Sequence, residues 1–216
     1  MAETAHKTRP AQIVIGLLLS IGVAELPLGT WSERLFSPLA GHEVFWGLAV
    51  LVLLLYVALI ERRPLSSIGF RKFGFWGIVS AIIAGVLMVV AIVVIYTFVF
   101  PALHLRINMG EMKKLMDTPF WYRLLLVTRA AVAEETLFRG YPIERIEELT
   151  RSRVLAGVIS WAAFTIAHLS SWGWPQLIVA GTGGVILTVL YLWRRNLWVN
   201  MIAHFIADGS GFLAPH

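Results

Sequence analysis

The sequence predicts an all-α, polytopic transmembrane helical bundle with about seven spans, within a range of six to eight. Apolar residues make up 58% of the 216 residues, whereas Asp, Glu, Lys and Arg together make up only 14%. Soluble domains carry about 25% charged residues. Apolar stretches close to the ~20 residues of one membrane crossing recur along most of the chain. Residues 48–60 are apolar on every side, which favours helices over the alternating strands of a membrane barrel.

The expected spans follow one another in a single integral membrane domain, residues 1–216. The first begins after basic residues, as a signal peptide does, but the hydrophobic spans after it favour an uncleaved segment. The third is long enough to cross with a tilt. The fourth is the least regular because it contains Arg and Glu. If it is re-entrant, the membrane orientation of every later segment is inverted. The seven ranges are 11–29, 43–60, 73–100, 120–138, 153–169, 175–193 and 197–213.

The net charge of +5 is explained by topology, and we expect no nucleic-acid partner. With seven spans and a cytoplasmic N-terminus, the opposite side carries only Arg34, Arg106, Lys113 and Lys114. This asymmetry agrees with the enrichment of Lys and Arg in cytoplasmic loops. The cytoplasmic segments carry Lys7, Arg9, Arg62, Arg63, Arg71, Lys72, Arg139, Arg145, Arg151, Arg153, Arg194 and Arg195.

Ionisable groups inside membrane segments are costly, so each one is a candidate for function. There is no cysteine, which excludes disulfides, thiolate nucleophiles and cysteine-ligated zinc. Glu25 lies near the end of a span and is expected to reach the interface. Arg123 and Arg129 are expected to reach the interface or line a polar cavity. The set inside the spans is Glu25, Arg123, Arg129, Glu134, Glu135, His168, His204 and Asp208.

Three segments each place polar groups on one helical face. Glu135 and Arg139 are four residues apart and are expected to form a structural ion pair, whereas Glu134 points about 100° away. Phe164 and His168 share one face of the fifth span, with Phe164 expected to pack. His204 and Asp208 share one face of the last span. These groups can converge only in the interior of the bundle.

A converging glutamate and two histidines fit two kinds of chemistry, and both activate a water. In one, the carboxylate acts as a general base. In the other, Glu134, His168 and His204 bind zinc or another divalent metal. Other hydrolase signatures are missing: His42-Glu43 begins like H-E-x-x-H but has no second histidine, and there is no G-x-S-x-G motif.

The motifs Glu-Glu-x-x-x-Arg, Phe-x-x-x-His and His-x-x-x-Asn/Asp resemble those of the CAAX protease and bacteriocin-processing (ABI) family. That family consists of integral membrane proteins related to the prenyl-protein endopeptidase of eukaryotes. The matching positions are Glu134, Glu135, Arg139, Phe164, His168, His204 and Asp208. A motif-bearing catalytic core is therefore expected at about residues 120–213, and the first 130 residues match only in being apolar and helical.

The resemblance implies an intramembrane endopeptidase that is either glutamate-dependent or metal-dependent. It implies that Glu134 and His168 activate the attacking water, and that His204 and Asp208 stabilise the oxyanion. Glu135 and Arg139 would hold the site. The best-studied branch has Asn at the position of Asp208, and an ionised Asp cannot donate a hydrogen bond to an oxyanion. Asp208 would then be protonated, orient His204 and favour its imidazolium form, or bind a metal.

The expected partners are the lipid bilayer and a peptide or membrane-protein substrate, in what is expected to be a bacterial inner membrane. Two other functions remain open. One is a non-catalytic scaffold or bacteriocin-immunity protein of the same fold. The other is a transporter, since buried Glu, His and Asp also line ion pathways. The absence of an internal repeat disfavours the transporter.

Overall fold

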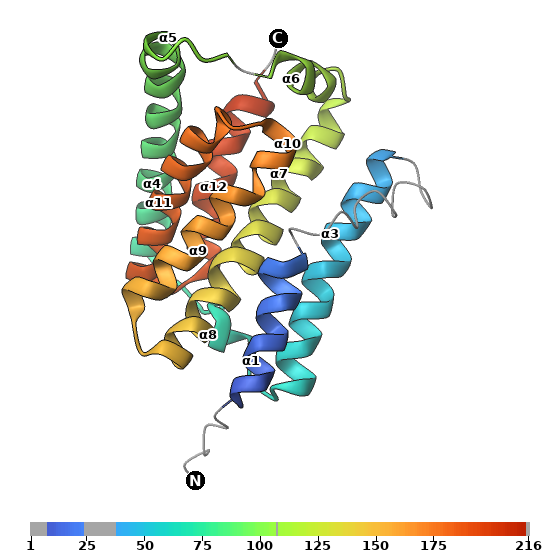
Figure 1. Cartoon of the computed structure of the whole chain (residues 1–216), viewed down its shortest axis with the longest axis vertical. Coiled ribbons are helices and arrows are strands. Elements are labelled where there is room, and N and C mark those ends of the chain that lie inside the picture. Colours follow the sequence, from blue (N-terminus) through green and yellow to red (C-terminus); the bar gives the residue numbers. More distant parts are fainter. Residues whose placement is uncertain (1–7, 24–37, 107, 215–216) are drawn as a thin grey trace.

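A computed structural model describes residues 8–23, 38–106 and 108–214 of the chain, and all the regular elements in these ranges are helices (Figure 1). Glu25, Lys7 and Arg34 lie outside the described residues. The N-terminal elements are α1 (Pro10–Leu17), the π-helical turn η1 (Leu18–Gly22), α3 (Pro38–Leu55) and the π-helical turn η2 (Tyr56–Ile60). A short 3-10 turn, η3 (Leu65–Ile68), leads to α4 (Phe75–Val94), which continues through η4 (Ile95–Val99) into α5 (Phe100–Ala102).

The second half of the chain contains the elements that carry the motifs. The short helix α6 (Met109–Met116) precedes α7 (Phe120–Glu134), which runs through the π-helical turn η5 (Glu135–Gly140) into α8 (Tyr141–Thr150). The last elements are α9 (Arg153–Ala167), α10 (Leu169–Trp172), α11 (Gln176–Arg194) and α12 (Leu197–Phe212). Within the described residues, the expected ranges coincide with helices, whereas residues 24–29 of the first range lie outside the described residues. The helices α6 and α8 lie in segments that we expected to be loops.

The all-helical prediction is confirmed for the described residues, whereas the number of spans is only partly supported. Three helices are long and apolar enough to cross a membrane: Gly41–Ile60, Phe75–Ala102 and Gln176–Arg194. Pro10–Gly22 and Arg153–Ala167 are apolar but shorter. On α4, an uninterrupted stripe of exposed aliphatic side chains faces outward, which is the pattern of a lipid-facing surface; it includes Ile78, Ile82, Ile83, Val86, Val90 and Val93.

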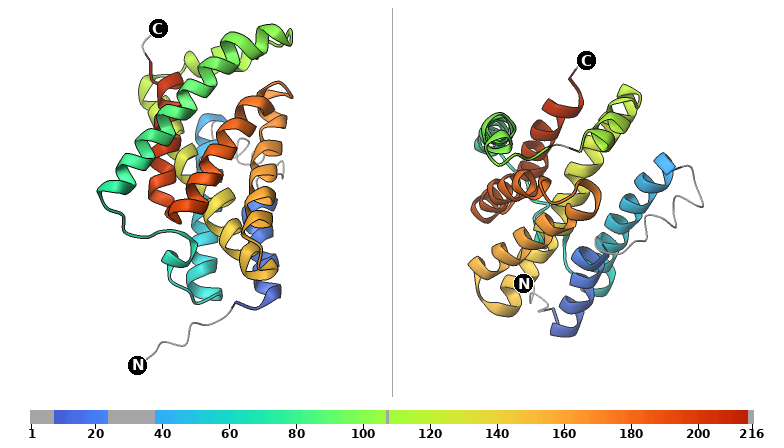
Figure 2. Two further views of the ribbon diagram at one scale, coloured as in Figure 1. Left: turned by 90° about the vertical axis from the view of Figure 1, so that its left-hand side faces the viewer. Right: turned by 45° about the horizontal axis from the view of Figure 1, so that its top comes forward.

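The long helices form a bundle in which the chain direction alternates from one to the next (Figure 1). The pair α1 and α3 lies along one side, against η5 and α8, while α4 crosses α11 and α12 diagonally on the other side (Figure 2). Small residues make the crossing close: Ala81 and Ala84 of α4 pack in one buried cluster with Ala203 and Ala207 of α12. The helices α7, α9 and α12 lie between these outer elements and carry the motif residues.

A cluster of three buried residues, here called the Glu61 clasp, joins the N-terminal helices to α8. The Glu61 carboxylate accepts hydrogen bonds from Arg145 Nε at 3.2 and 3.0 Å, from Arg145 Nη2 at 2.5 Å and from the Tyr141 hydroxyl at 2.7 Å. Burial and the hydrogen bond to Glu61 raise the pKa of Tyr141, so its hydroxyl stays a donor. The expectation that Arg145 is a loop charge is wrong, because it is 1% exposed and lies inside α8.

Candidate active site

Glu134 is the last residue of α7 and faces two histidines from other helices. Its Oε2 atom lies 4.0 Å from His168 Nε2 at the end of α9 and 3.9 Å from His204 Nε2 on α12. The wider π-helical turn η5 begins at the next residue, and such turns occur frequently at functional sites. Gly140 closes this turn, where a Cβ atom would lie 2.6 Å from the Ile68 carbonyl oxygen. Directly after the site, the chain is therefore packed tightly against η3.

Glu135 is fully buried and its carboxylate joins η5 to α12. Its Oε1 atom accepts from Arg139 Nη1 at 3.0 Å and from His204 Nδ1 at 2.9 Å, and its Oε2 atom accepts from Asn200 Nδ2 at 3.0 Å. The expected pair of Glu135 and Arg139 is therefore present, and both side chains have no exposed surface. Both oxygens of this carboxylate are occupied within the fold, which leaves Glu134 as the carboxylate that faces the histidines.

Arg139 and Phe164 form a stacked pair beneath the histidines. The Arg139 guanidinium carbon lies 3.7 Å from the centre of the Phe164 ring. Cation–π stacking of this kind is strongest when the pair is desolvated. The Phe164 ring also lies 4.6 Å from the His168 ring and 6.3 Å from the His204 ring, measured between centroids. Phe164 thus has a packing role, as expected, and its partners include three polar motif residues: Arg139, His168 and His204.

A hydrogen bond fixes the tautomer of His168 and so determines that the nitrogen facing Glu134 is an acceptor. His168 Nδ1 lies 2.8 Å from the backbone oxygen of Phe164. A carbonyl oxygen only accepts, so Nδ1 carries the proton. In the neutral imidazole, Nε2 is then the free acceptor, and this is the atom that faces Glu134. The last turn of α9 therefore sets both the position and the tautomer of His168.

Three carboxylates surround the ring of His204. Glu135 accepts from Nδ1, while Nε2 faces Glu134 and also Asp208 Oδ2, at 3.5 Å. His204 is almost entirely buried, whereas the side chains of Glu134, His168 and Asp208 retain 19%, 22% and 26% of their exposure. The motif residues from α7, η5, α9 and α12 are thus brought together, with an enclosed side formed by Glu135 and a more accessible side formed by Glu134.

Asn200 is a buried residue of the site that the motifs did not predict. It lies one turn before His204 on α12 and donates to Glu135 Oε2, and its Nδ2 atom also lies 2.8 Å from the Leu187 carbonyl oxygen on α11. Its spacing of four residues from His204, which in turn precedes Asp208 by four, is a signal in the sequence that could have identified it. Asn200, His204 and Asp208 form one polar stripe along α12.

The other ionisable residues of α7 lie apart from this cluster. Arg129 Nε donates to Glu43 Oε2 at 2.9 Å, and the Tyr122 hydroxyl donates to Glu43 Oε1 at 3.2 Å. Glu43 of α3, which belongs to the incomplete H-E-x-x-H motif, is therefore the ion-pair partner of Arg129. Arg123 Nη1 lies 3.9 Å from the sulfur of Met116. These contacts attach α3 and α6 to α7 and do not include the motif residues.

The described residues do not form a metal-binding group as they stand. No cluster of three or more His, Asp or Glu among them has the geometry to hold a metal ion. Glu134 Oε2 is 3.9 and 4.0 Å from the two imidazoles. Two ligands about 2.0–2.1 Å from one tetrahedral zinc would be only about 3.3 Å apart.

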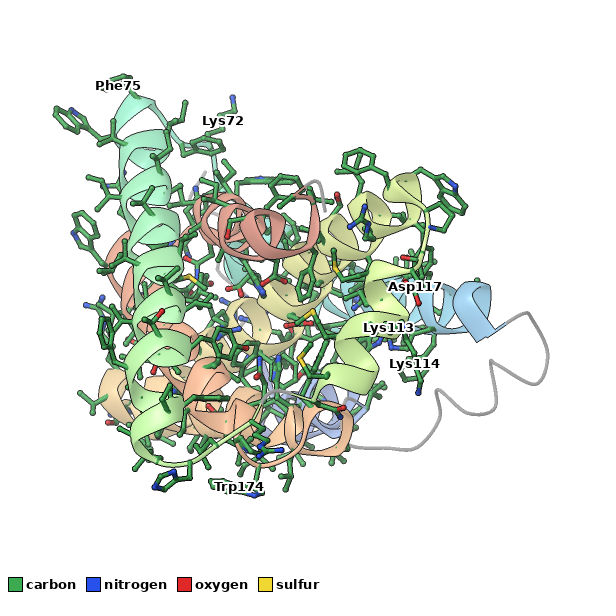
Figure 3. All side chains as sticks on the ribbon, turned by 90° about the horizontal axis from the view of Figure 1, so that it is seen from above. Lys72, Phe75, Lys113, Lys114, Asp117 and Trp174 are labelled. Carbon is green, nitrogen blue, oxygen red and sulfur yellow. The ribbon has the colours of Figure 1, made fainter. Side chains whose placement is uncertain are left out.

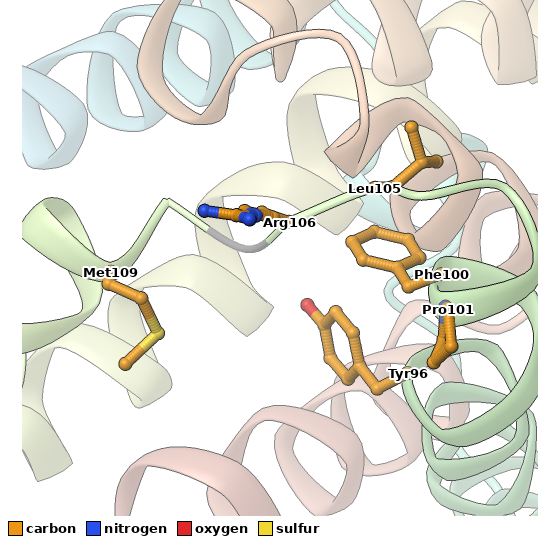
Figure 4. Close-up of a pocket in the computed structure, with 6 residues that line it drawn as sticks. All are labelled: Tyr96, Phe100, Pro101, Leu105, Arg106 and Met109. Atoms are coloured by element: carbon orange, nitrogen blue, oxygen red, sulfur yellow. The ribbon is translucent and has the colours of Figure 1, made fainter.

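Two surface hollows lie away from the motif residues. One of about 330 Å³ is bordered by residues of η4, α5 and α6 and the segment between them (Figure 4): Tyr96, Phe100, Pro101, Leu105, Arg106 and Met109. The other, of about 470 Å³, is lined by Phe70, Arg71, Lys72, Phe73 and Trp198. Neither contains a motif residue.

Comparison with known proteins finds a similarity to the class of protease that the motifs resemble. Residues 116–210 match the family described as type II CAAX prenyl endopeptidase Rce1-like, and every motif residue lies inside this segment. The match confirms the resemblance to CAAX-type proteases. The description of the matched family is that of an endopeptidase.

The chain is also similar to a protein named YpbD from Bacillus subtilis (strain 168), described as uncharacterized. The two are 34% identical over 110 residues, which is 50% of this chain and 53% of the relative. The chain thus matches about half the length of this relative. No solved structure matches the chain.

Proposed function

We propose that this protein is an intramembrane endopeptidase that hydrolyses a peptide bond of a membrane-associated peptide or protein. Glu134 is the general base that activates the water. The observation that carries this proposal is the approach of Glu134 Oε2 to the Nε2 atoms of His168 and His204, at 4.0 and 3.9 Å, from three different helices. These distances are longer than a direct hydrogen bond and match two groups that share one small bound molecule.

In the proposed reaction, a water donates one hydrogen bond to Glu134 and one to His168 Nε2. The tautomer of His168 supports this role, because its Nδ1 proton is held by the Phe164 carbonyl. The water oxygen then attacks the carbonyl carbon while its proton moves to Glu134, and Glu134 returns the proton to the leaving amine. General acid–base catalysis of this kind contributes about 10²–10⁴ in rate.

His204 is proposed to stabilise the oxyanion that forms on the carbonyl oxygen. Its Nδ1 proton is held by Glu135, so the ring is fixed and Nε2 is directed toward Glu134. A charged imidazole donates from Nε2, and the surrounding carboxylates stabilise its charge. Asp208, at 3.5 Å from Nε2, is proposed to orient His204, since an ionised carboxylate has no proton to donate.

The proposed site lies within a membrane domain of seven spans, with residues 120–213 as the catalytic core. The alternating direction of α1, α3, α4, α7, α9, α11 and α12 supports this topology (Figure 1). This topology places most of the described Lys and Arg residues at the end of the bundle where α1 begins, which is the proposed cytoplasmic end. The bacterial relative supports a bacterial cell membrane as the location.

The proposal is tested by comparing the cleavage of membrane proteins in cells that express the wild type or Glu134→Gln. N-terminal proteomics of the membranes identifies new protein ends, and a purified substrate peptide then gives rates in detergent. We expect ends that depend on Glu134, and a rate about a thousandfold lower for the variant. Glu43→Gln is the matched control, because it removes a membrane carboxylate outside the site.

Three outcomes would contradict the proposal. Equal cleavage by Glu134→Gln would remove Glu134 from the chemistry. Activity that is lost after chelation and restored by zinc would replace the base mechanism with a metal mechanism. A biological effect of the protein that persists in Glu134→Gln, with no dependent cleavage, would favour the scaffold or immunity function.

A further inference from the structure

The hollow lined by Phe70, Arg71, Lys72, Phe73 and Trp198, here called the Lys72 hollow, combines cations with exposed aromatic rings. It lies between the linker that precedes α4 and the first turn of α12. Seen from above, Lys72 lies near Phe75 at the outer edge of the bundle, far from Lys113 and Lys114 of α6 (Figure 3). Because the hollow lies at the edge of the bundle, molecules outside the bundle can reach it.

The backbone around the Lys72 hollow is fixed by contacts with α12. Asn196 Nδ2 donates to the carbonyl oxygens of Arg71 and Lys72, at 2.7 and 3.3 Å. The Leu197 backbone N–H donates to the Gly69 carbonyl at 2.8 Å. The Phe70 and Trp198 rings meet edge to face, with 5.5 Å between their centroids. These contacts hold the two cations on a defined piece of backbone.

The charge of the Lys72 hollow is only partly balanced. Arg71 Nε donates to the Ser66 carbonyl at 2.9 Å, and its Nη2 lies 3.6 Å from Glu144. The Lys72 side chain is exposed, and its ammonium group forms no ion pair or hydrogen bond with the residues that the structure describes. The hollow therefore offers one free ammonium group and one guanidinium that is shared with a carboxylate.

The surroundings of the Lys72 hollow are apolar and continue into the outward face of α4. Phe75 and Trp76, in the first turn of that helix, are each 70% exposed. Aromatic residues in such positions are typical of the membrane–water boundary. A soluble anion would gain no binding energy from the apolar residues. A phospholipid, in contrast, can place its phosphate against the cations and its acyl chains against the apolar residues at the same time.

We propose that the Lys72 hollow binds the headgroup of an anionic phospholipid. Lys72 contacts the phosphate diester, Arg71 supports it, and the acyl chains lie along the exposed aromatic and aliphatic residues at the start of α4. The hollow near Arg106 is a weaker candidate because it contains one cation (Figure 4). This site is separate from the proposed peptidase site, and binding does not require catalysis.

The test measures lipid binding to the full-length protein in detergent by native mass spectrometry. The probes are phosphatidylglycerol and phosphatidylcholine with identical acyl chains, with glycerol 1-phosphate as a competitor. We expect the protein to retain phosphatidylglycerol in preference to phosphatidylcholine. Lys72→Gln should weaken this binding about fivefold, as expected for the loss of one cation near a lipid surface. Lys113→Gln, an equivalent change on α6, should have no effect, and Glu134→Gln should bind like the wild type.

The result for a second variant separates lipid binding from simple charge attraction. Phe73→Ser keeps both cations and should also weaken phosphatidylglycerol binding, because the acyl chains lose part of their surface. Circular dichroism of each variant checks that it is folded. Equal retention of the two lipids, equal effects of Lys72→Gln and Lys113→Gln, or displacement of the lipid by an equal concentration of glycerol 1-phosphate would each overturn the proposal.

Discussion

The Glu61 clasp and the Glu134 site both bury carboxylates beside cations, but the clasp is closed and the site is open. In the clasp, Glu61 accepts several direct hydrogen bonds from Arg145 and Tyr141, between 2.5 and 3.2 Å. In the site, Glu134 makes no contact with either histidine shorter than 3.9 Å. Glu61 is almost fully buried, whereas Glu134 retains 19% of its side-chain exposure.

The difference separates charges that hold the fold from charges that remain available for chemistry. A buried carboxylate whose hydrogen bonds are all satisfied has no capacity left for a substrate. Glu135 belongs to the first kind although it is adjacent to Glu134, because Arg139, His204 and Asn200 occupy both of its oxygens. Burial alone therefore does not identify a catalytic carboxylate; an incomplete set of direct partners is the more useful sign.

The largest expected effect comes from breaking the clasp. Arg145→Met leaves Glu61 buried without its cation, and removing one partner of a buried pair costs about 3–5 kcal/mol. The free energy of unfolding in mixed detergent micelles measures the loss. The double variant Glu61→Leu, Arg145→Met should recover most of it, because apolar replacement of a whole buried pair is often neutral. Equal stability of Arg145→Met and the wild type would show that the clasp does not hold the helices together.

A smaller effect is expected where α1 contacts the clasp. A Cβ atom on Gly16 would lie 1.7 Å from the Tyr141 hydroxyl oxygen, so Gly16→Ala must displace Tyr141 or α1. Overpacking of this kind costs about 1–3 kcal/mol. The melting temperature should fall, while a Cβ atom on Gly47 would meet nothing within 4 Å and Gly47→Ala serves as the control. A similar melting temperature for both variants would refute the close approach.

The smallest effect concerns the enclosed side of the site. Asn200→Leu removes the hydrogen bond to Glu135 Oε2 and should reduce kcat about tenfold with little change in KM, since Asn200 positions the groups that hold His204. Steady-state cleavage of the substrate peptide measures both constants. Thr128→Val, which loses a hydroxyl bonded only to its own helix, is the control. A changed KM with an unchanged kcat would place Asn200 in substrate binding instead.

The sequence was sufficient to predict the long helices and the residues that meet in the site, but not the helices α6 and α8 or the arrangement of the partners around the site. Apolar runs and spacings of four residues depend on local geometry, which is why Glu135–Arg139 and His204–Asp208 were predictable pairs. The partners of Arg145 and Arg129 lie 84 and 86 residues away, and no local pattern connects them. Arg145 was consequently assigned to a loop. The π-helical turn at Glu135 was also missed, because its sequence is compatible with an ordinary α-helix.

The distance along the chain between the two halves of the clasp has a consequence for biosynthesis. Arg145 is synthesised 84 residues after Glu61. At ribosomal rates of about 5–20 residues per second, this is a delay of about 4–17 s. During that time, α1 and α3 have left the ribosome while the carboxylate has no guanidinium to neutralise it. Glu61 must then remain at the aqueous boundary, and the N-terminal pair docks only after α8 emerges. The insertion machinery or a chaperone therefore has an interval of seconds in which to hold this hairpin apart from the rest of the nascent protein.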